Sequence, residues 1–254
     1  MEQHKSAVRE KVWRELRKVA SPDSRFDYDF SEFIADFEGS SEALAQLTQL
    51  PCYQSARIIF ITPDNCLDEL RLRALRDGKL ILMTTYAIRR GFRLLDPSKI
   101  TPSRYEFAAT LDGAEKVARP ITLLELIDEK MSIELMVTGT GAINLKGVRF
   151  GKGHGFFDLE WAMLYTIGAI SPKTHTAAIV HECQVLDEPL TPEEFDTVCD
   201  VMATPSRIIK VPEVKKPVCG ILWHRLAPGM LESTPPLREL KQLIESGTIK
   251  QPEL

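Results

Sequence analysis

The residues best suited to chemistry lie in one glycine-rich, basic stretch from Gly139 to Glu160, which reads GTGAINLKGVRFGKGHGFFDLE. Glycines let a backbone turn sharply and approach a ligand closely, and successive N–H groups ahead of a helix can bind an anion. Arg149 and Lys152 would add positive charge to this loop. Asp158 and Glu160 could supply oxygen ligands to a hard cation such as Mg²⁺. The stretch predicts a phosphate site with a metal ion.

The elements on either side must position this loop. The apolar run Ile133–Thr138 predicts a strand before it. Residues 156–170 predict a helix after it, because Leu159, Met163 and Ile167 fall on one face. The loop is therefore expected to join the end of a buried strand to the N-terminus of a helix.

An earlier strand–helix–strand unit predicts a parallel sheet. Ala56–Ile61 is too uniformly apolar for a sheet with one wet face, and a helix over Asp68–Arg76 separates it from the next strand, Lys79–Met83. Asp64 follows the first of these strands. Loops in this position often carry ligands, although an aspartate there is more often a turn former.

Other helices have recognisable start or stop signals. Val8, Val12 and Leu16 fall on one face of a helix over Glu2–Val19. The remaining helices are expected at Ser40–Leu50, at Thr122–Lys130 with a capping box of Thr122 and Glu125, at the start of Leu190–Ala203 where Thr191-Pro192 would cap a short helix, and at Pro236–Glu245. Strands are expected at Thr176–Val180 and Thr204–Val211, and the proline-containing tail from Pro212 is expected to pack on a body formed by residues 1–211.

Three further groups of side chains allow a structural or a functional interpretation. Lys5 and Arg9 share a helix face that is either solvated or part of a site. Residues 84–120 form an irregular excursion whose arginines are either solvated or a second anion contact: Arg89, Arg90, Arg93 and Arg104. His181 and Cys183 are either structural or ligands for a soft metal.

The overall composition indicates a soluble globular protein. The chain has 254 residues, 44% of them hydrophobic and 27% charged, with a formal net charge of −4. The acidic balance argues against a general binder of nucleic acid or membrane surfaces. No apolar run approaches the ~18–20 residues that span a bilayer, and the charged N-terminus argues against a signal peptide. Five scattered cysteines without a CxxC pair predict a reduced, cytoplasmic compartment.

The run Gly147–Asp158 resembles the G-x-R-x-G-x-G-x-G-Y-Y-D signature of the 5-formyltetrahydrofolate cyclo-ligase family, the methenyltetrahydrofolate synthetases. Lys5 and Arg9 match a K-x-x-x-R pattern of that family, and Leu190–Pro205 is similar to its closing segment. Gly151–Glu160 and the tail from Lys215 resemble most the methenyltetrahydrofolate synthetase domain-containing branch. The resemblance implies a three-layer α/β/α, Rossmann-like fold with a mainly parallel sheet, shared with sugar-phosphate isomerases and CoA transferases.

The resemblance also implies an activity: Mg²⁺- and ATP-dependent closure of 5-formyltetrahydrofolate, or a related N-formyl compound, to the 5,10-methenyl form. It implies ATP binding by Lys5, Arg9, Arg149, Gly151, Lys152, Gly153, His154 and Gly155. It implies catalytic roles for Arg149, Lys152 and Asp158, metal binding by Asp158 and Asp196, and substrate binding by Asp64, Phe156 and Phe157.

Two departures from the family pattern leave an alternative open. Phe156 and Phe157 replace the paired tyrosines and so lack two hydroxyls, and Asp64-Asn-Cys-Leu67 is a reduced form of an acid-x-acid-Thr motif. The alternative is a non-catalytic or altered-substrate nucleotide-binding protein of the same fold. An RNA-associated protein, by analogy with animal members of the branch, is opposed by the acidic net charge.

Overall fold

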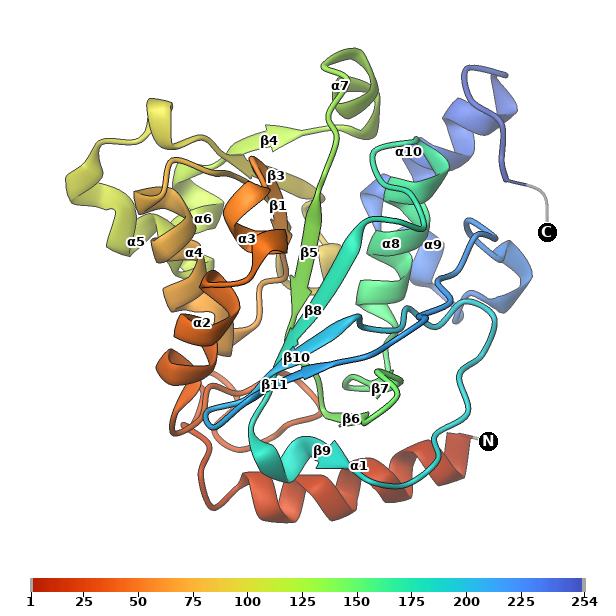
Figure 1. The fold of residues 1–254 in the computed structure, drawn as a ribbon. Coiled ribbons are helices and arrows are strands. Elements are labelled where there is room, and N and C mark those ends of the chain that lie inside the picture. The colour runs from red at the N-terminus through yellow and green to blue at the C-terminus, as the bar shows by residue number, and fades with distance from the viewer. Residues whose placement is uncertain (1, 253–254) are drawn as a thin grey trace.

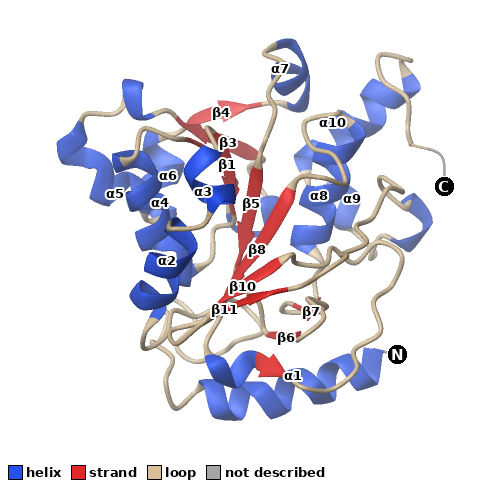
Figure 2. Cartoon of the chain, in the orientation of Figure 1, coloured by secondary structure: helices blue, strands red, loops and turns tan. Residues whose placement is uncertain are grey.

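An eight-stranded, mainly parallel β-sheet runs through the middle of the computed structural model, which describes residues 2–252 (Figures 1 and 2). The strands in spatial order are β11 (Ile208–Lys210), β10 (Val201–Ala203), β8 (His175–Ile179), β5 (Leu135–Thr138), β1 (Ile58–Ile61), β2 (Leu80–Thr84), β3 (Phe92–Leu95) and β4 (Arg119–Ile121). The five from β10 to β2 run parallel, and β11, β3 and β4 pair antiparallel at the two edges.

Both faces of the sheet are buried, which explains the uniformly apolar strands. Successive side chains of a strand point to opposite faces. In β1, Ile59 and Ile61 belong to one core cluster and Phe60 to the other. An edge or one-sided sheet would instead alternate apolar and polar residues.

Helices cover the two faces and give a three-layer α/β/α arrangement (Figure 1). One face carries α2 (Ser40–Thr48), α3 (Pro51–Ser55), α4 (Asp68–Arg76), α5 (Tyr105–Ala109) and α6 (Leu111–Val117). The other carries α7 (Leu123–Asp128), α8 (Phe156–Thr166), α9 (Met230–Ser233) and α10 (Pro235–Glu245). The expected fold class is confirmed. None of these helices, nor α1, is long and apolar enough to cross a membrane.

A second, small sheet and α1 (Glu2–Leu16) lie together beyond the carboxyl ends of the parallel strands (Figure 1). The small sheet consists of β7 (Arg149–Phe150), β6 (Ala142–Asn144) and β9 (Val185–Leu186). Val8 and Val12 of α1 pack against Ala142 and Phe150 in this sheet. The stretch after β5 is therefore no simple loop, because a β6–β7 hairpin precedes the glycine-rich turn.

Short 3-10 segments complete the described chain: η1 (Asn65–Leu67), η2 (Tyr86–Ile88), η3 (Pro97–Lys99), η4 (Pro102–Arg104), η5 (Glu182–Gln184) and η6 (Trp223–Arg225). His181 caps η5, where its Nδ1 accepts a hydrogen bond from the Cys183 N–H at 3.2 Å, and its ring lies 5.8 Å from that of Phe37. This is a structural role for His181.

Besides the simple loop expected between β5 and α8, two further sequence predictions are wrong. Residues 84–120 are no irregular excursion, since they contain β3 and β4, which extend the sheet, and two helices that cover it. The helix expected at Thr191-Pro192 is absent from the described chain, and residues 191–200 are mostly irregular, with one turn at residues 194–195, ahead of β10. There the Asp196 carboxylate accepts a hydrogen bond from the Glu193 N–H at 2.9 Å, closing a tight turn in place of a helix.

Candidate functional site

A cavity of about 400 Å³ opens where the carboxyl ends of β1, β2 and β5 meet the glycine-rich turn. Thr62 and Asp64 follow β1, Thr84 is the last residue of β2 and Thr85 comes after it, and Gly139 follows β5. This edge is where open parallel sheets bind ligands, because the loops leaving neighbouring strands converge there.

The structure brings every predicted site residue to this one cavity. Its lining includes Lys5, Arg9, Asp64, Arg149, Gly151, Lys152, Gly153, His154, Gly155, Phe156, Phe157, Asp158 and Asp196. The four cations among them come from α1, β7 and the turn that follows β7. The arginines of the 84–120 region, Arg89, Arg90, Arg93 and Arg104, do not line it.

The glycine-rich turn approaches α1 closely. Gly153 has φ +104°, and a Cβ there would lie 3.5 Å from the Arg9 guanidinium. Gly155 has φ +67° and caps the N-terminus of α8 in the left-handed conformation. Side chains are strained at these φ values, so glycine is favoured at both positions. The first turn of α8 lines the cavity, and the N–H groups of a helix N-terminus lack partners within the helix, as an anion site requires.

Arg149 and Asp158 form a buried ion pair at the start of α8. The Arg149 Nη2 lies 2.5 Å from the Asp158 Oδ1, and its guanidinium lies 4.4 Å from the centroid of the Phe157 ring. The same carboxylate oxygen accepts the Thr197 N–H at 2.8 Å. Burial raises the pKa of Asp158, and Arg149 opposes this shift by attracting the charged form. The Nε of Arg149 has no partner among residues 2–252.

Lys5 of α1 is held by two acids from the segment before β10. Its Nζ lies 3.1 Å from Glu193 Oε1 and 3.3 Å from Asp196 Oδ2. Burial lowers the pKa of Lys5, but the two carboxylates together outweigh burial and raise it. Of the two interpretations of the helix face that carries Lys5, the structure favours a part of the site over a solvated face, because Lys5 is buried and lines the cavity.

Lys152 has a different environment. Its Nζ donates to the backbone carbonyl of Glu32 at 2.7 Å and faces the Tyr86 ring at 5.0 Å and the Phe156 ring at 5.8 Å. Burial lowers the pKa of Lys152, while nearby carboxylates, Asp64 first among them, oppose the shift. A partly desolvated ammonium group of this kind interacts strongly with a phosphate that enters the cavity.

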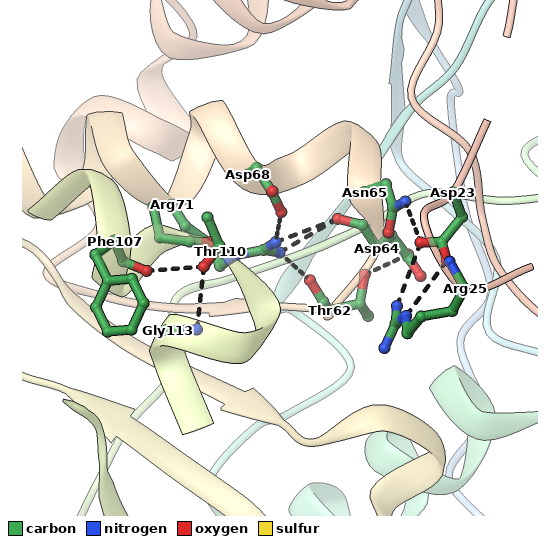
Figure 3. A network of polar contacts seen from close by, with 11 residues as sticks. Asp23, Arg25, Thr62, Asp64, Asn65, Asp68, Arg71, Phe107, Thr110 and Gly113 are labelled. Atoms are coloured by element: carbon green, nitrogen blue, oxygen red, sulfur yellow. Dashed lines mark hydrogen bonds and ion pairs between the residues drawn. The ribbon is translucent and has the colours of Figure 1, made fainter. Parts of the chain in front are cut away.

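Asp64 is fixed in place by the strand ends around it (Figure 3). Its Oδ2 accepts a hydrogen bond from the Thr62 hydroxyl at 2.5 Å, as Figure 3 shows. The same oxygen accepts a hydrogen bond from the Gly139 N–H at 2.8 Å. Arg71 of α4 is fully buried and donates to the carbonyl of Thr62 at 2.6 Å, so it holds the loop that carries Asp64. Arg25, which also lines the cavity, is held by the Asp23 carboxylate at 3.3 Å.

The paired phenylalanines occupy different positions. Phe157 is buried and packs against Phe60, with ring centroids 6.4 Å apart. Phe156 is only partly buried, and its ring lies 5.4 Å from that of His154. Phe156 is therefore the better placed of the two to contact a ligand ring.

A metal ion in this cavity would need ligands from a bound molecule as well as from the protein. Residues 2–252 contain no group of three or more His, Cys, Asp or Glu side chains arranged to hold a metal. Asp158 and Asp196 are nonetheless close enough for Asp196 to raise the pKa of Asp158. Two carboxylates fit Mg²⁺, which commonly binds through one or two carboxylates together with substrate phosphates and water.

Glu160 and several residues of the tail also line the cavity. Glu160 of α8, which the sequence suggested beside Asp158 as an oxygen ligand for a hard cation, is 2% exposed, and burial raises its pKa to about 8. Several of the lining residues that the sequence did not single out belong to the tail. The tail supplies a further wall: Ile221, Leu222, Leu226 and Met230, with Arg225, which pairs with Glu193 and lies over the Phe195 ring at 5.3 Å.

Comparisons with known proteins agree on one family. Two curated proteins named methenyltetrahydrofolate synthase domain-containing protein are similar to the chain, one from Danio rerio (33% identity over 242 residues) and one from Homo sapiens (32% over 240). Each match covers 93% of this chain and 61% of the relative, so the chain spans about three fifths of their length. These matches extend past residue 205 and so include part of the tail.

A solved structure shares the fold. The NMR structure of Aquifex aeolicus 5,10-methenyltetrahydrofolate synthetase superposes with a TM-score of 0.50 at 15% identity, over 84% of this chain and 95% of that chain. The profile of the 5-formyltetrahydrofolate cyclo-ligase family matches residues 1–205. That match spans most of the chain, including the glycine-rich turn, and the chain therefore belongs to the 5-formyltetrahydrofolate cyclo-ligase family.

Proposed function

We propose that the protein is an ATP- and Mg²⁺-dependent cyclo-ligase that converts 5-formyltetrahydrofolate, or a related N-formyl compound, to the 5,10-methenyl form. One observation carries the proposal. The predicted cations Lys5, Arg9, Arg149 and Lys152 line a single cavity together with the glycine-rich turn, the first turn of α8 and the carboxylates of Asp158 and Asp196. This combination suits the transfer of a phosphoryl group, which is catalysed mainly by positioning and charge neutralisation.

Each residue has a role in the proposed reaction. The formyl oxygen of the substrate attacks the γ-phosphorus of ATP and ADP leaves; N10 then attacks the activated formyl carbon and loses its proton, and phosphate leaves. Lys5 and Arg9 bind phosphates together with the N–H groups of residues 151–155. Arg149 and Lys152 neutralise the charge that develops on the transferred group.

Two further groups bind the metal ion and the acceptor. Asp158 and Asp196 would hold Mg²⁺, which supplies additional neutralisation of phosphate charge when it is bound. Asp64 and the ring of Phe156 contact the folate-like acceptor. The Phe157 ring packs against the Arg149 guanidinium.

A second candidate is a nucleotide-binding protein of the same fold with a different acceptor or none. It is favoured by the phenylalanine pair, because neither ring has a hydroxyl and Phe157 is packed into the core.

One assay separates the two candidates. Purified protein is incubated with ATP, Mg²⁺ and 5-formyltetrahydrofolate, and the absorbance of the methenyl product is followed. Product formation that requires ATP supports the cyclo-ligase. Intact ATP binding by calorimetry without any product supports the second candidate.

A further inference from the structure

Glu160 is a buried acid with one unused oxygen in the wall of the cavity. The side chain is 2% exposed and lines the cavity near the end of β2. Its Oε1 accepts a hydrogen bond from the Thr84 hydroxyl, and its Oε2 has no partner anywhere in the described chain. Buried polar atoms are nearly always hydrogen-bonded, so an exception at a cavity points to a ligand.

The position of Glu160 is fixed by its neighbours. The adjacent Trp161 is buried and donates from Nε1 to the Pro217 carbonyl at 3.0 Å, which locks the rotation of α8. The nearby cations have other partners, since Arg149 pairs with Asp158 and Lys152 donates to the Glu32 carbonyl. Glu160 is therefore no member of a structural ion pair in this part of the fold.

The unpartnered Oε2 of Glu160 needs a hydrogen-bond donor, which a ligand in the cavity would supply. Oε2 can accept a hydrogen bond whether or not the group carries a proton, because the Thr84 hydroxyl can accept a proton on Oε1 as well as donate to it. Asp64 adds a second acid to the same corner of the cavity. Arg149 and Lys152 are also near enough to interact with Glu160, but both have other partners. Because Oε2 is an acceptor, it suits the N–H donors of a neutral heterocycle and does not suit phosphate oxygens, which are also acceptors.

We propose that Glu160 Oε2 accepts a hydrogen bond from the 2-amino group of the acceptor's pteridine ring, with Thr84 holding the carboxyl group in place. This inference rests on the proposed function, since it concerns the substrate of that reaction. The 2-amino group lies at the end of the ring system remote from N5 and N10. Binding that end at Glu160 leaves the formyl group free to face the cations of the glycine-rich turn.

The test uses two variants and two ligands. Glu160→Leu removes both oxygens at similar size, and Glu160→Gln keeps one acceptor. We expect Glu160→Leu to weaken binding of 5-formyltetrahydrofolate by tenfold to a hundredfold and to leave ATP affinity within twofold, with Glu160→Gln in between, by calorimetry. Glu182→Gln is the matched control, because that glutamate bonds Ser206 and does not line the cavity.

A second, independent test changes the ligand and not the protein. Wild-type protein should bind the 2-desamino analogue of 5-formyltetrahydrofolate at least tenfold more weakly than the parent compound, and Glu160→Leu should lose this discrimination. Equal binding of both ligands by wild-type protein overturns the inference and leaves the proposed function standing. A Glu160→Leu defect confined to ATP also overturns it. Failure of wild-type protein to bind 5-formyltetrahydrofolate overturns the cyclo-ligase proposal and the inference together.

Discussion

At the scale of single residues, charged side chains of the cavity form ion pairs with one another, and a bound ligand can replace one partner of such a pair. Lys5 pairs with Glu193 and Asp196, and Arg149 pairs with Asp158. Such pairs keep the side chains ordered, so a phosphate does not have to order them when it binds. Lys152 differs, because its ammonium group is held by a neutral carbonyl and two aromatic rings.

Replacing Lys152 should therefore have a large effect on nucleotide binding. Lys152→Ala removes a charge-assisted contact of about 1.5–3 kcal/mol, so ATP affinity should fall by roughly tenfold or more. Lys146→Ala is a suitable control, since Lys146 is an exposed lysine of the preceding hairpin turn. Isothermal calorimetry measures the ATP affinity of both variants. Equal affinity of the two variants would show that the glycine-rich turn has only a structural role.

At the scale of elements, the site depends on loops that the core holds in place. Asp23 fixes the 20–39 loop over the cavity, since it bonds Arg25 and accepts a hydrogen bond from Asn65 at 2.9 Å. Burial would raise the pKa of Asp23, but the bonds from Arg25 and Asn65 outweigh it and lower the pKa to about 2. A charged group therefore ties the loop to η1, the segment just before α4.

This pKa shift predicts a pH dependence of stability. A carboxyl group with a lowered pKa in the folded state stabilises the protein above its unfolded pKa, and the stabilisation is lost as the pH falls through the folded value. The contribution of Asp23 should be complete above about pH 4 and lost toward pH 2. Asp23→Asn should be less stable than wild type at pH 7, with the difference shrinking below pH 4. Urea unfolding at a series of pH values measures it, and a constant difference would contradict the prediction.

The elements also show why some predictions succeeded. The helix bounds Asp68–Arg76 agree with α4, and the capping box of Thr122 and Glu125 is present, because these signals are local. The short helix expected at Thr191-Pro192 had equally good local signals. Its acids are instead bonded to Lys5, more than 180 residues away along the chain, and such contacts override local preference.

At the scale of the whole molecule, the tail is part of the same core as the sheet. Leu237 and Leu240 of α10 are fully buried in the cluster that also contains Phe60 and Met136. The sequence indicated a tail that packs on the body, but no local signal placed it at the cavity. The apolar tail residues that line the cavity are of the same types as the residues that fill a core. The cations and glycines of the site, in contrast, were predictable because their types and spacing are unusual.

The shared core predicts a single unfolding transition. Leu240→Ala should lower the free energy of unfolding by about 2–5 kcal/mol, as expected for a buried leucine. Leu75→Ala, in α4 on the opposite face of the sheet, should have a similar effect. Urea unfolding followed by far-ultraviolet circular dichroism and by tryptophan fluorescence should give coincident curves for both variants. A separate early transition in Leu240→Ala alone would mean that the tail folds independently.

The wall contributed by the tail has a consequence for synthesis on the ribosome. Lys5 and Met230 both line the cavity, and the ribosome makes Lys5 long before Met230. Once the ribosome has released the glycine-rich turn, the nascent chain already carries Lys5, Arg149 and Lys152. Its cavity still lacks the wall that the tail supplies. Capture of a ligand in a closed cavity must therefore wait until the ribosome has released the segment around Met230. A chain terminated before that point would carry the phosphate-binding side chains without an enclosed place to use them.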